Sequence, residues 1–183
     1  NNYGDSGSHE VGPHSIGTFY WEIEEVDGIV IGYPSAFAVA PSNDSWLYVG
    51  FKDKILRSTD GGFNWTVVTE EVGAYDMAVH PLLAGVVTFY SSAGELRQLI
   101  GGVLQAPLET EVGFSRTPGR IAYEPLNGGA MWLLEDRYCL KYAGGSWETQ
   151  ADNLYNPRSL RAYYGGTGLT QLIFVTDFSM QYS

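Results

Sequence analysis

Short runs in which apolar and polar side chains alternate are the main pattern along this chain. One run covers residues 46–51, a second covers 54–58 and a third covers 64–69. Such alternation is typical of half-buried β-strands. No stretch of ten or more residues keeps apolar side chains at helical spacing without a glycine or a proline. The pattern therefore predicts an all-β chain.

A tetrapeptide that begins with alanine recurs along the chain. Three copies continue with a β-forming residue, a variable residue and proline, and a fourth copy has glycine in place of the proline. The four alanines, 40, 44 and 40 residues apart, are Ala38, Ala78, Ala122 and Ala162. A glycine pair follows each of the first three alanines, at 61–62, 101–102 and 144–145. Two markers with one period indicate a structural repeat.

Each repeat contains about four short segments with strand character. The expected strands are 37–40, 46–51, 55–59 and 65–69 in the first repeat, 77–80, 86–90, 96–100 and 103–108 in the second, and 121–123, 131–134, 138–142 and 147–150 in the third. Four antiparallel strands in about 40 to 45 residues are typical of a β-propeller blade. Since an isolated sheet would leave one face in water, the repeats are expected to pack on one another. We predict a β-propeller of about four four-stranded blades.

The fourth repeat has room for only three strands, at 160–164, 172–176 and 178–182. Trp21, in the alternating segment 19–24, precedes its alanine by about the same distance as Trp65 and Trp147 precede theirs. We expect segment 19–24 to supply the missing strand, because ring closure removes two exposed sheet edges. Residues 27–33 would then form an additional hairpin. The alternative is an arc of about four blades that belongs to a larger wheel.

The expected organisation is one domain that follows a flexible arm. The arm covers residues 1–16, and the domain covers 17–183, with repeats at about 36–76, 77–120, 121–158, and 159–183 together with 17–34. The arm contains His9, Glu10 and His14. Ligands on a flexible segment lack the fixed geometry of a metal site. We therefore favour a solvated tail, and we expect no metal and no other cofactor.

One turn carries a specific motif. The residues from 58 to 65 match the pattern Ser-x-Asp-x-Gly-x-x-Trp at Ser58, Asp60, Gly62 and Trp65. The motif resembles the Asp-box, or BNR repeat, of sialidase-like, sortilin-like and xyloglucanase-like β-propellers. The resemblance implies a turn between the third and fourth strands of a blade, in which Ser and Asp bond backbone amides, Gly adopts a positive φ and Trp packs beneath the hairpin. It implies a structural role for Asp60 rather than a catalytic one.

Charge and hydropathy exclude several classes of partner. The chain has 21 acidic and 10 basic residues, for a net charge of −11. Proteins that bind nucleic acid neutralise phosphates with clustered lysine and arginine, so no nucleic-acid partner is expected. The apolar runs are far shorter than the roughly 20 residues that span a bilayer, so no membrane insertion is expected. The acidic composition, the single Cys139 and the Asp-box favour an extracellular, cell-surface or virion location.

The resemblance to sialidases and other glycosidases implies catalytic groups that this sequence does not show as a set. Sialidases have an Arg-Ile-Pro stretch, whereas this chain has Arg120-Ile121-Ala122. Carboxylates near expected turns are not paired by their spacing: Asp53, Asp76, Glu111, Asp136 and Asp152. We therefore favour a protein that is not an enzyme, namely an interaction or structural module that belongs to an oligomer or to a larger assembly such as a viral one. The alternative is a sialidase-like or xyloglucanase-like glycoside hydrolase, or a fragment of one.

Loops that lead from one blade to the next are the expected binding surface for a protein or glycan partner. These loops, at 70–74, 113–119 and 152–158, should converge on one face. They contain four candidate ligand-binding residues: Phe114, Arg116, Tyr155 and Arg158. An aromatic side chain beside an arginine suits a sugar or a carboxylate. Ordinary packing within the loops is the competing interpretation.

Overall fold

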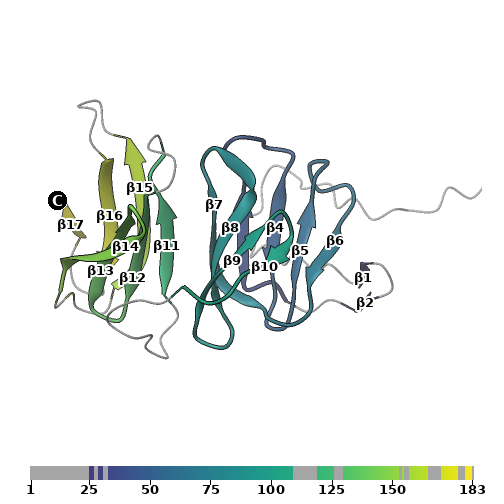
Figure 1. Cartoon of the computed structure of the whole chain (residues 1–183), viewed down its shortest axis with the longest axis horizontal. Coiled ribbons are helices and arrows are strands. Elements are labelled where there is room, and N and C mark those ends of the chain that lie inside the picture. Colours follow the sequence, from purple (N-terminus) through teal and green to yellow (C-terminus); the bar gives the residue numbers. More distant parts are fainter. Residues whose placement is uncertain are drawn as a thin grey trace, which may run out of the picture.

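The fold is known from a computed structural model. It describes residues 25–26, 29–30, 33–108, 119–125, 130–152, 154, 157–164, 170–176 and 180–182. Every regular element within these ranges is a β-strand (Figure 1). The described part of the chain contains no helix that is long and apolar enough to cross a membrane. The prediction of an all-β chain is confirmed.

The strands form antiparallel sheets in which neighbours in sequence are neighbours in the sheet. Blade 1 consists of β3 (Ala36–Val39), β4 (Leu47–Gly50), β5 (Ile55–Ser58) and β6 (Thr66–Thr69). Blade 2 consists of β7 (Ala74–His80), β8 (Leu83–Ser91), β9 (Leu96–Ile100) and β10 (Val103–Leu104). Blade 3 consists of β11 (Arg120–Tyr123), β12 (Met131–Glu135), β13 (Tyr138–Ala143) and β14 (Ser146–Ala151).

Two smaller sheets complete the described structure. Blade 4 has three strands, β15 (Pro157–Tyr164), β16 (Thr170–Thr176) and β17 (Met180–Tyr182). A two-stranded hairpin of β1 (Glu25–Val26) and β2 (Ile29–Val30) precedes blade 1. The hairpin lies close to the expected position at 27–33 but begins two residues earlier. The three-strand content of the fourth repeat agrees with the sequence pattern.

Apolar side chains fill the space between successive blades. Tyr48 and Ile55 of blade 1 pack in one cluster with Phe89 of blade 2. Similar clusters lie between blades 2 and 3 and between blades 3 and 4. Each sheet thus buries apolar faces against its neighbours, as the alternating pattern requires.

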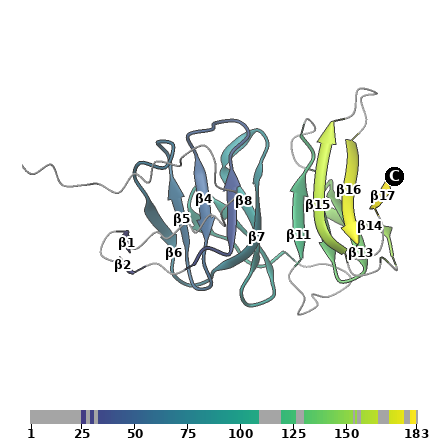
Figure 2. The same cartoon turned by 180° about the vertical axis from the view of Figure 1, so that it is seen from behind.

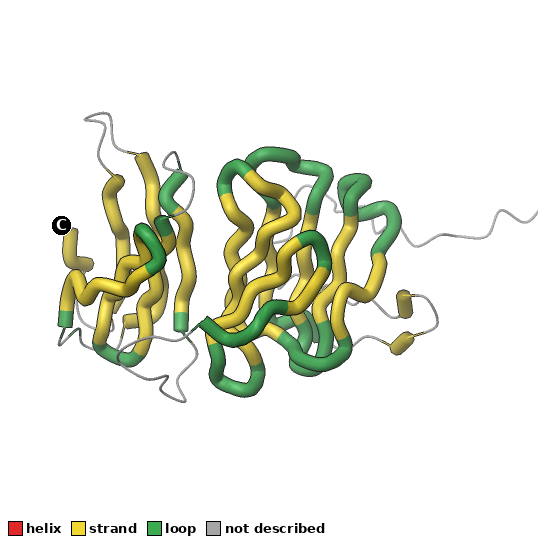
Figure 3. Tube along the Cα trace, viewed as in Figure 1, coloured by secondary structure: helices red, strands yellow, loops and turns green. Residues whose placement is uncertain are grey.

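The four blades follow one another in sequence order. Their first strands, β3, β7, β11 and β15, lie next to one another in turn. Figures 1 and 2 show blade 1 and blade 4 at opposite ends of the row, and the trace in Figure 3 shows the same order. The described sheets therefore form an open arc. The expected closing segment 19–24 and the arm 1–16 lie outside the described residues, so ring closure and the domain boundaries stay predictions.

The fourth repeat differs in register from the other three. Ala38, Ala78 and Ala122 each pack in the cluster that their own blade shares with the following blade. Ala162 instead packs, together with Leu160, in the cluster shared with the preceding blade 3. Because side chains alternate between the faces of a strand, a shift of one residue exchanges the two faces. The alignment of Ala162 with the other three alanines is therefore wrong by one residue.

Strand β10 is shorter than the expected strand 103–108. Only Val103 and Leu104 pair with β9 in regular register. The backbone continues alongside β9 through hydrogen bonds from Gln105 N to Gln98 O, 2.9 Å, and from Leu108 N to Leu96 O, 2.8 Å. A regular ladder cannot continue here, since proline 107 has no N–H to donate.

Candidate functional site

The turn between β5 and β6 is held together by its own side chains. The Ser58 hydroxyl donates to Asp60 Oδ1 (2.8 Å) and accepts from Gly62 N (2.9 Å) and Asp60 N (3.3 Å). Asp60 also accepts from Asn64, through the backbone N at 2.9 Å and through Nδ2 at 2.6 Å. Trp65 Nε1 donates to Gly62 O at 2.9 Å. Every polar side chain of the motif thus bonds within the turn.

The electrostatics of the turn reflect these bonds. Hydrogen bonds from the Asn64 backbone, the Asn64 side chain and Ser58 lower the pKa of Asp60 from 3.8 to about 2. Hydrogen bonds to a carboxylate stabilise its charged form. Trp65 packs against the cluster of Val49, Phe51 and Leu56 on one face of blade 1. Asp60 is therefore an ionised acceptor that holds the turn.

The paired glycines are explained by backbone conformation. Gly61 and Gly62 have φ values of 79° and 96°. The pairs at 101–102 and 144–145 also have positive φ, and each forms a two-residue hairpin loop. Two consecutive positive φ values match the right-handed twist of the strands and favour glycine. The sequence period therefore marks the same turn in three blades, although only the first carries the full motif.

The expected ligand-binding residues are not brought together within the described structure. Phe114, Arg116 and Tyr155 lie outside the described residues, and Arg158 is described only as backbone in β15. Their proposed role stays a prediction. The residues 9, 10 and 14, considered as metal ligands, also lie outside the described ranges. Within the described ranges no group of His, Cys, Asp or Glu could hold a metal ion.

Among the carboxylates near turns, Asp76 has a structural contact. Its Oδ2 accepts a hydrogen bond from Ile121 N at 2.9 Å and so connects β7 to β11. Three others are exposed, at Asp53, Asp136 and Asp152, and Glu111 lies outside the described residues. No arrangement of two described carboxylates across a cavity is evident from these contacts.

Two further carboxylates are buried, and the sequence analysis did not identify them. Glu124 lies 2.8 Å from Lys141 Nζ and accepts from Trp132 Nε1 at 3.3 Å. Glu135 accepts from Tyr90 of blade 2 at 3.3 Å. Burial raises the pKa of Tyr90, and the nearby Glu135 charge raises it further. Glu124 thus connects strands within blade 3, and Glu135 connects blade 3 to blade 2; both residues are 3% exposed.

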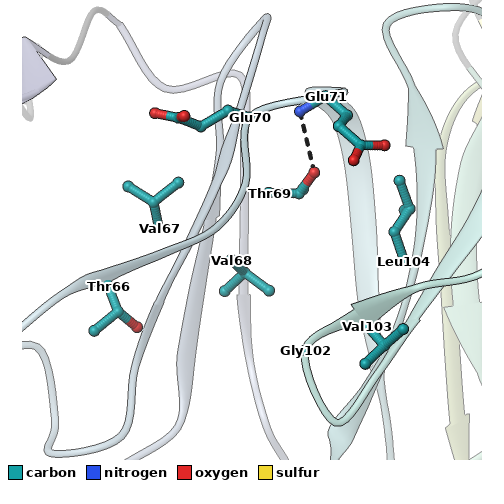
Figure 4. Close-up of a pocket in the computed structure, with 9 residues that line it drawn as sticks. All are labelled: Thr66, Val67, Val68, Thr69, Glu70, Glu71, Gly102, Val103 and Leu104. Atoms are coloured by element: carbon teal, nitrogen blue, oxygen red, sulfur yellow. Dashed lines mark hydrogen bonds between the residues drawn. The ribbon is translucent and has the colours of Figure 1, made fainter.

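A groove of about 720 Å³ lies between the outermost strands of blades 1 and 2 (Figure 4). The lining residues are Thr66, Val67, Val68, Thr69, Glu70, Glu71, Gly102, Val103 and Leu104. Figure 4 shows Val68 on one side and Val103 and Leu104 on the other, with Glu71 directed towards Leu104. Its lining includes two carboxylates and no basic side chain. The groove is partly apolar and acidic at one end.

Both strands beside the groove are the last strands of their sheets in the part of the chain that the structure describes. Within the described structure, β6 pairs only with β5, and β10 pairs only with β9. An edge strand presents unpaired backbone N–H and C=O groups to an extended partner. The sequence could not reveal the groove, because its two sides come from segments about 35 residues apart that only blade packing brings together.

Comparison with known proteins identifies the fold. No protein-family model and no curated protein matches the sequence. Similar solved structures include a GH74 enzyme from Niastella koreensis (TM-score 0.59, 18% identity over 82% of this chain and 29% of that chain). A GH74 xyloglucanase from Xanthomonas campestris has a TM-score of 0.58, with 15% identity over 86% of this chain and 26% of its own. YCF48 bound to D1 peptide has a TM-score of 0.54, with 13% identity over 82% of this chain and 50% of its own.

These similarities concern the fold and not the chemistry. The identities are below 20%, and this chain spans between about a quarter and a half of the length of these proteins. One fold commonly supports unrelated functions. The sheets, their order and the structural neighbours together show that this chain has the β-propeller fold.

Proposed function

We propose that this chain is a non-catalytic β-propeller module that binds a protein partner, with an extended basic segment of the partner lying in the groove between β6 and β10. The groove itself carries the proposal. Its apolar side chains, Val68, Val103 and Leu104, suit alternate side chains of an extended segment. Glu70 and Glu71 suit a lysine or arginine at one end. A structural neighbour was solved with a bound peptide, which agrees with a protein partner.

The test is selection of binding peptides followed by affinity measurement. A displayed library of random peptides is selected on the wild-type chain, and enriched peptides are synthesised. We expect them to carry a basic residue. Glu71→Lys should weaken their binding about 10-fold, equivalent to about 1.4 kcal/mol, since it replaces a favourable charge contact with a repulsive one.

Val103→Lys gives a second test of the same groove. Val103 is 64% exposed, so the substitution leaves the blade core intact. The matched control is Phe63→Lys, because Phe63 is 88% exposed and lies in the turn outside the groove. Weaker binding to the two groove variants with unchanged binding to the control supports the proposal. The proposal is overturned if the peptides bind all three variants as tightly as the wild-type chain, or if no peptide is enriched on the wild-type chain.

We also propose that the turn from Ser58 to Trp65 is an Asp-box with a structural role. Its hydrogen bonds and its place between the third and fourth strands of a blade support this assignment. An extracellular, cell-surface or virion location is proposed on the acidic composition, the single cysteine and the resemblance of this turn to an Asp-box. Immunolabelling of the native source would test the location, and cytosolic labelling alone would contradict it.

The glycoside hydrolase alternative has a direct test. A panel of glycosidase substrates that includes xyloglucan is incubated with the wild-type chain. Turnover that is abolished by Asp53→Asn, Asp136→Asn or Asp152→Asn would establish the hydrolase alternative and replace the proposal of a non-catalytic module. These residues are exposed, so their substitution leaves the fold unchanged.

A further inference from the structure

Arg57 in blade 1 and Lys141 in blade 3 occupy equivalent positions. Each is the third member of a cross-strand row that begins at the repeated alanine. The rows are Ala38, Tyr48 and Arg57 in blade 1, and Ala122, Trp132 and Lys141 in blade 3. Cross-strand partners share one face of a sheet, and both alanines pack towards the following blade. Both basic side chains therefore lie on the face that is turned towards the following blade.

Lys141 has a carboxylate partner that belongs to its own repeat. The buried Glu124 lies 2.8 Å from Lys141 Nζ and is the third residue of the repeated tetrapeptide. The third residue of the tetrapeptide in blade 1 is Ala40. The backbone N of each of these two residues donates to the carbonyl that precedes the second strand of its blade, at 2.9 and 3.0 Å. The positions are thus equivalent, but Ala40 has no carboxylate to offer Arg57.

The described partners of the Arg57 guanidinium are neutral. The ring of Trp46 lies 5.2 Å from Arg57 Cζ, and the guanidinium donates a hydrogen bond to the Tyr48 hydroxyl. None of the ion pairs among the described residues includes Arg57, and its Nε is buried without a hydrogen-bond partner there. An arginine side chain keeps its proton in proteins, and a charge removed from water is stabilised by an opposite charge. The side chain, which is half-buried, is therefore suited to a further, anionic partner.

The guanidinium lies at one end of the groove between β6 and β10. Arg57 Nη1 is 3.6 Å from the point that a Cβ on Gly102 would occupy, and Val68 Cγ1 is 3.8 Å from the same point. Gly102 and Val68 both line the groove. Figure 4 shows Gly102 at the end of the groove opposite Glu70 and Glu71. Because Gly102 has no side chain, none lies between the guanidinium and the groove at this position.

We propose that Arg57 binds the carboxylate of an acidic side chain in the partner segment, so that the segment carries an acid and a base at opposite ends of the groove. This rests on the proposed function, since it concerns the same groove. Arginine binds carboxylates through charge-assisted hydrogen bonds from its planar set of N–H groups. Arg57 pairs with Thr66, and Glu70 lies four residues further along the chain.

This spacing defines the partner segment. At about 3.3 Å per residue, the two ends of the groove are about 13 Å apart, so the acid and the base are about four residues apart in an extended segment. Opposite charges at the two ends favour one direction of the segment and one register, because the reversed segment would place like charges together.

The test uses the peptides that are enriched on the wild-type chain. They are synthesised with acetylated N-termini and amidated C-termini, so that every carboxylate belongs to a side chain. We expect an acidic residue about four positions from the basic residue. Titration calorimetry gives the dissociation constant of each peptide and of a version in which the acidic residue is replaced by its amide. The amide version should bind the wild-type chain about 10-fold more weakly, because it lacks the charge that pairs with Arg57.

A double-mutant cycle assigns this loss to Arg57. Arg57→Gln should weaken the acidic peptide about 10-fold, and the amide replacement should then change binding by less than about 2-fold. Arg57→Lys keeps the charge but not the planar set of donors, so an intermediate loss is expected. The matched control is Arg137→Gln, which removes the same charge from an exposed arginine in blade 3, outside the groove. It should bind both peptide versions as the wild-type chain does.

Circular dichroism and thermal unfolding show whether Arg57→Gln is folded, since Arg57 also contacts Trp46 and Tyr48. If it unfolds, Arg57→Lys and the two peptide versions decide the test. The inference is overturned if no acidic residue is enriched, if the amide version binds the wild-type chain as tightly, if the two losses are independent, or if Arg137→Gln weakens binding equally. Binding that still depends on Glu71 would then leave the proposed function intact, whereas binding that Glu71→Lys does not change would overturn the proposed function itself.

Discussion

Removal of the Ser58 hydroxyl tests whether the turn between β5 and β6 stabilises the fold. The Ser58 side chain is 1% exposed and takes part in three hydrogen bonds, two to Asp60 and one to Gly62. A typical hydrogen bond contributes about 0.5 to 1.5 kcal/mol net. Water can replace the bonds to the exposed Asp60 better than the bond to the half-buried Gly62. We therefore expect Ser58→Ala to lower the free energy of unfolding by about 2 kcal/mol.

The assay is urea unfolding followed by tryptophan fluorescence, together with calorimetry. For a chain of this size, a loss of about 2 kcal/mol corresponds to a fall in Tm of about 4 to 8 °C. The control is Ser146→Ala in the equivalent turn of blade 3. Ser146 is exposed, and its hydroxyl donates to Ala143 O at 3.5 Å. The control should stay within about 0.5 kcal/mol of the wild type.

The result that would refute the reasoning is equal stability of Ser58→Ala and Ser146→Ala. It would show that backbone conformation alone holds the turn. A loss in Ser58→Ala but not in the control would assign the energy to the buried hydroxyl. If the dependence of the free energy of unfolding on urea concentration is the same in both variants, the difference between them reflects stability and not residual structure in the unfolded chain.

Three other substitutions test the structure. Gly73→Ala should lower the free energy of unfolding by about 3 kcal/mol or more, since the added Cβ would overlap the Phe51 carbonyl oxygen. Gly94→Ala has space for the Cβ and should cost only about 1 to 2 kcal/mol, from its positive φ. Calorimetry that finds equal losses in the two variants would contradict this. The pKa of Asp60 falls from 3.8 to about 2 on folding, so the ionised carboxylate stabilises the folded state above about pH 4, and this stabilisation is lost as pH falls towards 2. Asp60→Asn should therefore weaken the dependence of the free energy of unfolding on pH in this range, and an unchanged dependence would contradict the reasoning. Tyr123→Phe removes the hydroxyl that lies 2.6 Å from Thr88 Oγ1 and should lower the free energy of unfolding, measured in urea, by about 1 kcal/mol. Unchanged stability would show that this hydrogen bond between blades 2 and 3 does not stabilise the fold.

The local elements could be predicted from sequence because they depend on neighbouring residues. Alternation placed the strands of blade 1 within one or two residues of β3 to β6. The glycine pairs marked three turns because a positive φ is a property of the residue itself. In the fourth repeat, the alignment of Ala162 with the earlier alanines is wrong by one residue, because the tetrapeptide pattern does not determine which face of β15 packs on blade 3.

The candidate site was not predictable in the same way. The sequence pointed to the connecting loops, and one of them, at 70–74, supplies Glu70 and Glu71 to the groove, but the sequence did not point to Val68, Val103 or Leu104. None of these residues belongs to a chemical motif. They form a groove because two outermost strands of neighbouring blades lie side by side, which depends on how the blades pack.

By itself, the sequence determined the all-β class, the recurrence of small antiparallel sheets and the position of the three glycine turns, because hydrophobic alternation and glycine conformations act over a few residues. Only the tertiary structure decided which sheet faces meet, where a groove opens and which apolar positions stay exposed. Phe37 and Met77 have equivalent positions and similar chemistry, yet one is 58% exposed and the other 5%. Met77 packs in the cluster with blade 1, whereas Phe37 has no such neighbour within the described structure, and no local pattern contains this difference.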